Sequence, residues 1–340
     1  MKDNGKSKNA LIVVIYILAF ALGGGIAALY CRDVYSLILS AAGLVVIWVA
    51  TSLFHECGHL FAAKASGFEI IKFVVVGFCY DKTKRRKLRF KLFPEEMGEI
   101  TVIPKKVTDD GENGERYASV IVGGLIGHAL ATLVFIVVLL VADSFYVRSF
   151  FAFFTLSLAT LIINGVAGII PSSDGSLLKE KNFGGYEGYL DILRLLSDGV
   201  TYGSIYEKYF DSENCPDALK SAVRLFELRR EEELGNLETA RLKAAATPWI
   251  RVNDPELAAE ILFIGYFTGD KALIESYEYV AEYLDVVDEP YAQRLRLAKA
   301  KYNGDEAYFG AAYKTAIKAC GEEYFSGDGS FNKIMIERLA

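Results

Sequence analysis

The chain has 340 residues, of which 52% are hydrophobic and 24% are charged, and its formal net charge is −6. This hydrophobic content excludes a disordered protein, and the acidic balance excludes a basic protein that binds nucleic acid. The five cysteines form no Cys-x-x-Cys pair, so neither a disulfide framework nor a cysteine-rich zinc site is expected. Residues 179–340 carry 20 Lys and Arg against 29 Asp and Glu, so a near-neutral apolar half precedes an acidic half.

The apolar half predicts a membrane domain over residues 1–178. A transmembrane helix needs about 20 apolar residues, and four stretches meet this requirement. They are residues 10–31, 35–63, 117–142 and 149–173. The first stretch is too long for the core of a signal peptide, so we expect it to be retained as a helix. The sequence therefore predicts an α-helical multi-pass protein of the cell membrane, surrounded by the lipid bilayer.

The charge of the loops predicts how these helices are oriented. Residues 64–116 hold twelve Lys and Arg, whereas the loops around residues 32–33 and 143–148 hold one arginine each. Positively charged loops stay on the cytoplasmic side of a membrane. We therefore expect both chain termini, and the acidic half, to be cytoplasmic.

The second predicted helix ends with the motif His-Glu-Cys-Gly-His at residues 55–59. Positions i and i+4 of a helix share a face, so His55 and His59 can bind one Zn²⁺, with Glu56 beside the metal as a general base. Ionisable groups at membrane depth are costly and usually face a partner or a watery cavity. The alternative, two interfacial histidines that cap a span, does not account for Glu56 between them.

Residues 68–104 predict a β-hairpin region after this helix. Residues 68–79 and 87–92 are rich in β-branched and aromatic side chains and flank a charged turn, and residues 98–104 form a third short strand. Two interpretations stay open. One is an ordinary cytoplasmic hairpin; the other is a re-entrant hairpin beside the active site that pairs with an extended substrate.

A catalytic zinc with two histidine ligands needs a third protein ligand and an open position for water. The chain has one other histidine, His128, in the third predicted helix. The other candidate is Asp174, which follows the helix break at Pro171. Because Asp-Gly is a very common turn, Asp174-Gly175 is on local grounds better interpreted as the turn that ends the fourth helix.

Taken together, these motifs resemble the site-2 protease family of intramembrane zinc metalloproteases. Its members carry His-Glu-x-x-His in one transmembrane helix and Asn-x-x-Pro…Asp-Gly in a later one, and that aspartate is the third zinc ligand. The resemblance covers about the first 180 residues. It implies one Zn²⁺ per chain bound by His55, His59 and Asp174, with Glu56 as the catalytic base. It also implies hydrolysis of peptide bonds in membrane-protein or membrane-anchored substrates near the cytoplasmic face.

The sequence departs from the family pattern at two places. If Pro171 is the motif proline, Gly168 occupies the asparagine position, and Asn164 lies one turn earlier. In the third helix, His128 lies where family members often have a small or amide residue. Asn164 and His128 are therefore candidates for stabilising the oxyanion or orienting the substrate. For His128, a hydrogen-bonded histidine packed against a neighbouring helix is an equally good interpretation.

The acidic half, residues 185–340, repeats with a period of 34–35 residues, and Gly269-Asp270 recurs as Gly304-Asp305. The period, the turns and the helical spacing of apolar residues resemble tetratricopeptide-like helix pairs. We expect a solenoid-like cytoplasmic domain that docks a protein partner or regulates the enzyme. Its Tyr and Phe side chains are more typical of the core of such a stack than of a peptide groove.

Two classes of function fit these motifs. The first is an active intramembrane zinc metalloprotease with cytoplasmic repeats for docking or regulation, and the intact His-Glu-x-x-His and Asp-Gly motifs favour it. The second is a catalytically degenerate membrane receptor or scaffold of the same fold that acts through its repeats, and Gly168 and His128 leave it open. A zinc protease of another lineage, with a glutamate as third ligand, is disfavoured because the later apolar helices contain no Glu.

Overall fold

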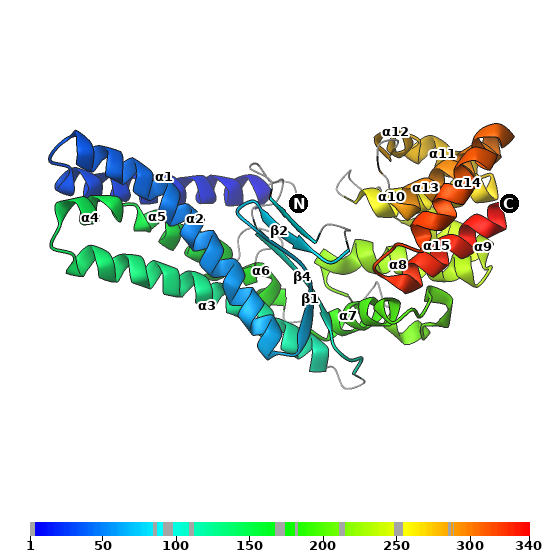
Figure 1. Ribbon diagram of the computed structural model, residues 1–340, viewed down its shortest axis with the longest axis horizontal. Coiled ribbons are helices and arrows are strands. Elements are labelled where there is room, and N and C mark those ends of the chain that lie inside the picture. Colours follow the sequence, from blue (N-terminus) through cyan, green and yellow to red (C-terminus); the bar gives the residue numbers. More distant parts are fainter. Residues whose placement is uncertain are drawn as a thin grey trace. The chain divides into compact units, whose positions relative to one another are not determined.

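The computed structural model describes residues 4–83, 87–90, 98–108, 112–166, 174–180, 183–210, 215–247, 254–284, 287 and 289–340. The chain is mostly helical and divides into two compact units (Figure 1). The first unit comprises residues 1–103 and 115–183, and the second comprises residues 104–114 and 184–340. Residues 104–114 were expected to belong to the first domain. They join the second unit, where the side-chain amide of Asn113 donates hydrogen bonds to the Lys106 carbonyl and to Asp191.

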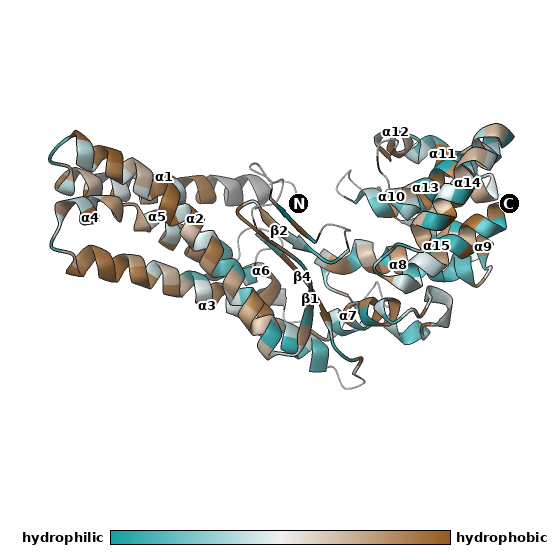
Figure 2. Ribbon diagram, in the orientation of Figure 1, coloured by the Kyte–Doolittle hydropathy of each residue, from teal (hydrophilic) through white to brown (hydrophobic). Residues whose placement is uncertain are grey.

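Within the described ranges, four helical segments of the first unit are long and apolar enough to cross a membrane. Three of them are continuous helices: α1 (Asn4–Tyr30), α2 (Val34–Ala65) and α3 (Glu112–Val141). Figure 2 shows that apolar residues predominate along all three. Because these helices also expose many large apolar side chains, water is a poor solvent for this unit.

The fourth apolar segment, Phe145–Gly165, is not one regular helix. It consists of α4 (Phe145–Phe150), a turn at residues 151–153, α5 (Phe154–Thr160) and a π-helical turn at Leu161–Val166. The apolar helical segment predicted at about residues 149–173 is therefore present, with a turn at residues 151–153. Residues 167–173, which include Gly168 and Pro171, lie outside the described residues. The short helix α6 (Asp174–Glu180) follows them.

Local sequence sets both ends of α2. The Asp33 carboxylate accepts a hydrogen bond from the Ser36 amide at 2.8 Å, and the Ser36 hydroxyl accepts one from the Asp33 amide at 3.1 Å. This reciprocal capping satisfies amides that a helix N-terminus leaves unpaired. At the other end, Gly67 has a φ of +82°, which turns the chain from the helix into the first strand.

The sheet of the first unit has four strands: β1 (Phe68–Val75), β2 (Phe78–Asp81), β3 (Leu88–Phe90) and β4 (Gly98–Pro104). Their order is β3-β2-β1-β4, so β4 has a strand neighbour on one side only among the described residues. The pairs β1–β2 and β2–β3 are antiparallel, with Val75 opposite Phe78 and Phe78 opposite Phe90.

The single strand predicted for residues 68–79 is wrong, because a tight turn divides it into β1 and β2. The turn is formed by Val76 and Gly77, whose φ angles are +43° and +89°. Two-residue hairpin turns need positive φ, which glycine adopts without strain and valine does not. The apolar run continues through the turn, so hydrophobic pattern alone does not reveal it.

The backbones of α2 and α3 approach so closely that no side chain fits between them. A Cβ atom on Gly58 would lie 2.1 Å from the carbonyl oxygen of Gly123, and one on Gly127 would lie 2.2 Å from that of Phe54. Small residues are typical of such close contacts between membrane helices. This contact holds the end of α2 that carries His55 and His59 against α3.

We expect Gly123→Ala to destabilise the first unit. The added Cβ would lie 2.4 Å from the Ala62 Cβ and 2.6 Å from the Gly58 carbonyl oxygen, so the helices must move apart. Overpacking of this kind costs about 1–3 kcal/mol and lowers the midpoint of thermal unfolding in detergent. Gly24→Ala on α1 is the matched control, because no atom of another described segment lies within 4 Å of its added Cβ. Equal midpoints for the two variants would contradict the close contact.

The second unit contains helices α7–α15. Their bounds are α7 Gly184–Ser197, α8 Lys220–Glu233, α9 Leu237–Ala246, α10 Pro255–Thr268, α11 Lys271–Tyr277, α12 Tyr279–Leu284, α13 Pro290–Asn303, α14 Glu306–Cys320 and α15 Ser326–Leu339. Three short 3₁₀ turns, at Tyr202–Ser204, Glu207–Tyr209 and Asp217–Leu219, lie between α7 and α8.

Two turns in this unit occur where the sequence repeat predicts them. Gly269 and Gly304 end α10 and α13 in the left-handed conformation, with φ angles of +71° and +72°. The next residue caps the following helix: Asp270 accepts from the Leu273 amide, and Asp305 accepts from the Tyr308 amide. The wider interpretation of these helix pairs as a tetratricopeptide-like solenoid stays a prediction.

Candidate metal and active site

Two histidines on consecutive turns of α2 form the base of the candidate site. The Nε2 atoms of His55 and His59 lie 3.1 Å apart. The His59 side chain is 8% exposed and the His55 side chain is 22% exposed. Their i,i+4 spacing places both side chains on one face of α2, within reach of each other.

Asp174, the first residue of α6, completes a group of three potential ligands. Its Oδ2 atom lies 3.2 Å from His55 Nε2 and 3.3 Å from His59 Nε2. This oxygen is buried and accepts no hydrogen bond from the described residues. Asp174 is thus brought to the histidine pair rather than turned out to solvent.

Gly175 explains how Asp174 reaches this position. A Cβ on Gly175 would lie 1.8 Å from the carbonyl oxygen of Gly165, in the π-helical turn that ends the fourth apolar segment. Only glycine permits this approach of two backbones. The Asp-Gly pair therefore lies in the first turn of α6 and packs against the π-helical turn, and the simple turn favoured on local grounds is not what forms.

The donor set fits zinc. A tetrahedral Zn²⁺ with bonds of about 2.0–2.1 Å separates its ligand atoms by about 3.3 Å, close to the 3.1–3.3 Å between these three atoms. His59 Nδ1 lies 2.7 Å from the Val120 carbonyl oxygen on α3. When Nδ1 donates this hydrogen bond, the tautomer leaves the Nε2 lone pair free for a metal. A buried carboxylate oxygen without a partner next to two imidazoles is an environment that a cation stabilises.

Glu56, which belongs to α2, lies beside this group and faces the first residue of strand β4. Its side chain is largely buried, and a Cβ on Gly98 would lie 2.1 Å from Glu56 Oε1. The backbone of β4 therefore begins in contact with the predicted catalytic carboxylate. This contact is made by the third predicted strand; a re-entrant hairpin beside the site and its pairing with a substrate stay predictions.

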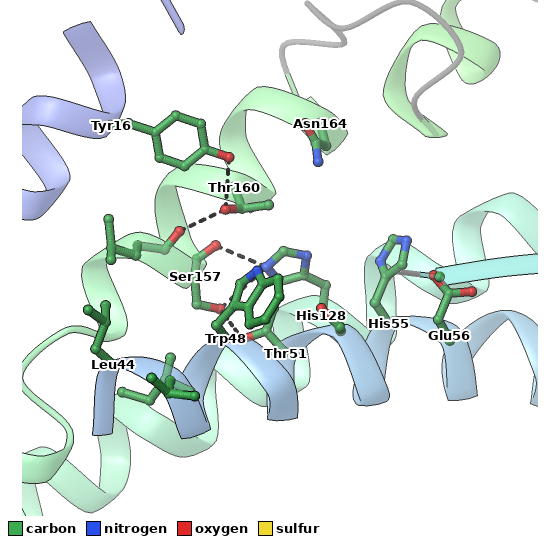
Figure 3. A pocket seen from close by; sticks show the side chains of 15 residues that line it. Tyr16, Leu44, Trp48, Thr51, His55, Glu56, His128, Ser157, Thr160 and Asn164 are labelled. Atoms are coloured by element: carbon green, nitrogen blue, oxygen red, sulfur yellow. Dashed lines mark hydrogen bonds between the residues drawn. The ribbon is translucent and has the colours of Figure 1, made fainter. Parts of the chain in front are cut away.

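A cavity of about 610 Å³ opens beside the histidines and Glu56 (Figure 3). It extends along α2 from His55 to Leu44, and its wall is mainly apolar with a few polar groups. Its lining comes from α1, α2, α3, α5, the π-helical turn and β4. A mostly apolar cavity with a small number of convergent polar groups is typical of a binding site.

His128 lines the cavity from α3 but is not part of the three-ligand group. Its Nε2 atom lies 2.9 Å from the Ser157 carbonyl oxygen. A neutral ring that donates from Nε2 has no proton on Nδ1, so it offers no second N–H to an oxyanion. Thr51 and Thr132 hydrogen-bond to the Ser157 hydroxyl in the same buried network. These contacts favour the packed, hydrogen-bonded interpretation of His128.

Asn164 lines the cavity with a side-chain amide that has two N–H donors, whereas His128 Nε2 is directed at the Ser157 carbonyl. Asn164 lies in the π-helical turn and points into the cavity (Figure 3). Its Oδ1 atom is buried and has no hydrogen-bond partner within the described part of the chain. π-Helical turns often occur at functional sites because the extra residue re-aims the side chains around it. Asn164 therefore supplies an amide at the cavity.

Several other polar residues of the cavity were not identified from the sequence. The hydroxyl of Tyr16 on α1 lies 3.1 Å from that of Thr160 on α5 (Figure 3). Ser157, Thr160 and Asn164 follow one another at intervals of three and four residues, which places them on one helix face. A search for polar residues at helical spacing inside apolar segments would have found this face.

Comparisons with family models, curated proteins and solved structures gave no match for this chain. The features that bear on function are therefore the three converging ligand atoms, the carboxylate beside them and the cavity. A catalytic zinc site has three protein ligands and an open position, whereas a structural site is closed by four. Three potential ligands with space beside them therefore fit the catalytic kind.

Proposed function

We propose that this protein is an intramembrane zinc metalloprotease, a metalloendopeptidase of the site-2 protease type. It hydrolyses peptide bonds of membrane-embedded or membrane-anchored protein substrates. The observation that carries the proposal is the convergence of His55, His59 and Asp174 next to Glu56, at a cavity between apolar helices. Histidine and carboxylate donors in this arrangement are the ligands of hydrolytic zinc sites.

The depth of the site supports cleavage near one face of the membrane. His59 precedes Lys64 by five residues, a rise of about 7–8 Å along the helix. The four apolar segments support insertion in a bilayer, and the basic residues between the second and third support a cytoplasmic location for this end of α2. Substrates would therefore be cut close to the cytoplasmic surface.

Each residue of the site has a distinct proposed task. His55, His59 and Asp174 hold Zn²⁺, which when bound polarises the scissile carbonyl and acidifies the attacking water. Glu56 accepts the proton of that water and delivers it to the leaving nitrogen. The Asn164 amide, which faces the same cavity, donates a hydrogen bond to the developing oxyanion.

Strand β4 supports a way to present the substrate. A transmembrane helix hides its carbonyls in its own hydrogen bonds, so the segment to be cut must unwind. The described part of the sheet gives β4 only β1 as a strand neighbour, and its first residue, Gly98, contacts Glu56. An extended substrate that pairs with the other edge of β4 would pass directly in front of the catalytic carboxylate.

Removal of zinc tests the proposal. We expect the purified full-length protein in detergent or vesicles to cleave a model transmembrane substrate, to stop after treatment with 1,10-phenanthroline, and to resume when the chelator has been removed by dialysis and one equivalent of Zn²⁺ is added. The reason is that the chelator removes the Lewis acid, whereas the fold and the general base Glu56 remain in place. The isomer 1,7-phenanthroline, which does not chelate, is the control. Cleavage that resists chelation would contradict a zinc mechanism.

A further inference from the structure

The helical second unit contains a cavity of its own, about 230 Å³ in volume. It lies among α7, the 3₁₀ turn at Tyr202–Ser204, α8, and the first turns of α10 and α15. Cavities that hold whole cofactors or drug-sized molecules measure about 300–1,000 Å³. The volume suits the end of one long side chain or a small organic ion.

One wall of this cavity carries acidic groups around an arginine whose guanidinium already donates hydrogen bonds to them. Arg229 is 1% exposed, and its guanidinium lies 2.7 Å from Glu256, 2.7 Å from Glu260 and 2.8 Å from Asp328. Three carboxylates thus share one guanidinium, whose donors are directed at them. Arg229 is therefore not available to bind an anion, and the wall is acidic overall.

The network behind this wall has more carboxyl groups than arginines, and burial keeps two of these carboxyl groups neutral. Arg294 contacts Glu260, and its Nη1 lies 3.7 Å from Glu232; burial and the neighbouring Glu260 carboxylate raise the pKa of Glu232 and favour its neutral form. Burial and the neighbouring Asp328 carboxylate raise the pKa of Glu323 to about 9. At pH 7 Glu323 is therefore protonated and adds no negative charge, so the acidic character of the wall comes from Glu256, Glu260 and Asp328, which together outnumber Arg229.

Aromatic rings form much of the remaining wall. The rings of Tyr189 and Phe226 are stacked, with centroids 5.9 Å apart, and the Tyr202 ring lies 5.7 Å from that of Phe226. Ring faces attract organic cations, and more strongly where water is excluded. They provide no ligands for a hard metal ion, which requires about six oxygen donors.

We propose that this cavity binds the guanidinium or ammonium end of an organic cation, held by Asp254 and Glu256 at the start of α10 and by the surrounding aromatic rings. Asp254 caps α10 through the Leu257 amide at 3.2 Å, and the Glu256 side chain is 40% exposed, so both carboxylates are accessible from the cavity. Two sources supply such a group: the Arg or Lys side chain of a peptide, and a free small amine or guanidine.

Calorimetric titration of the full-length protein in detergent tests the proposal. The probes are methylguanidinium, the peptide acetyl-Gly-Arg-Gly-amide, and the same peptide with the neutral isostere citrulline. We expect saturable binding of methylguanidinium or the arginine peptide, and at least about tenfold weaker binding of the citrulline peptide, because the charge-assisted hydrogen bonds are lost. If the arginine peptide binds much more tightly than methylguanidinium, the source is a peptide. If the two probes bind with equal affinity, the source is a small molecule.

Two variants probe the cavity by independent means. Asp254→Asn removes a charge but keeps a capping residue of equal quality, so α10 remains intact; we expect about tenfold weaker binding. Ala222→Phe leaves all charges in place and fills the cavity from α8, and it should abolish binding. Glu306→Gln, at a side chain 72% exposed on α14, is the control. Absence of binding by both cationic probes, equal binding of the citrulline peptide, or wild-type affinity in both cavity variants would overturn the proposal.

Discussion

Glu56→Gln is expected to abolish cleavage of a membrane substrate while zinc remains bound. Glutamine has the shape of glutamate, so the buried position beside Gly98 is filled as before. The amide cannot accept the proton of the attacking water, and loss of a general base costs about 10²–10⁴-fold in rate. None of the three converging ligand atoms belongs to Glu56, so the metal content should not change. The measurements are the initial cleavage rate and the zinc content of the purified variant.

Glu69→Gln is the matched control for this experiment. Glu69 lies on β1 and pairs with Lys82 at 2.6 Å, a partly exposed ion pair of little energetic weight. It should retain wild-type activity. If Glu56→Gln supports full function in cells whereas deletion of residues 185–340 abolishes it, the protease proposal fails and the receptor or scaffold alternative holds.

Asp174→Ala is expected to lose zinc and activity together. Removal of the third ligand leaves two histidines, and the affinity for zinc should fall by more than the 10–100-fold that is typical of changes around a ligand. The contacts of Asp174 Oδ2 are with the two histidines, so its loss removes a buried carboxylate while the packing of α2 against α3 is unchanged. The fold should therefore survive. Elemental analysis after dialysis, with thermal unfolding in parallel, measures both effects.

Asp143→Ala, at an exposed position after α3, is the control for the aspartate substitution. It should bind one zinc per chain, as the wild type is expected to do. An Asp174→Ala protein that still held stoichiometric zinc would show that another residue is the third ligand. His128, whose ring centroid lies 5.8 Å from that of His55, would then be the residue to test.

The membrane-length helices and the histidine pair were predictable from sequence because both depend on local properties. Hydrophobic length along the chain identifies helices that suit a bilayer. The placement of His55 and His59 on one face follows from helix geometry, while contacts with Val120 and Asp174 accompany the final orientation of their rings. The Gly-Asp turns at Gly269 and Gly304 belong to the same class, since a left-handed glycine followed by a capping aspartate is encoded within a few residues.

Other features depended on contacts between distant segments. Local sequence favoured a turn at Asp174-Gly175, yet the close approach of Gly175 to the Gly165 carbonyl brings Asp174 to the histidines. Hydrophobic pattern reports which side chains avoid water but not where the backbone bends. It therefore missed the turn at Val76-Gly77 and the interruption of the fourth segment. The hydrogen bond of His128 to Ser157 is likewise a property of packed helices, because a donor's partner is set by what lies beside it in space.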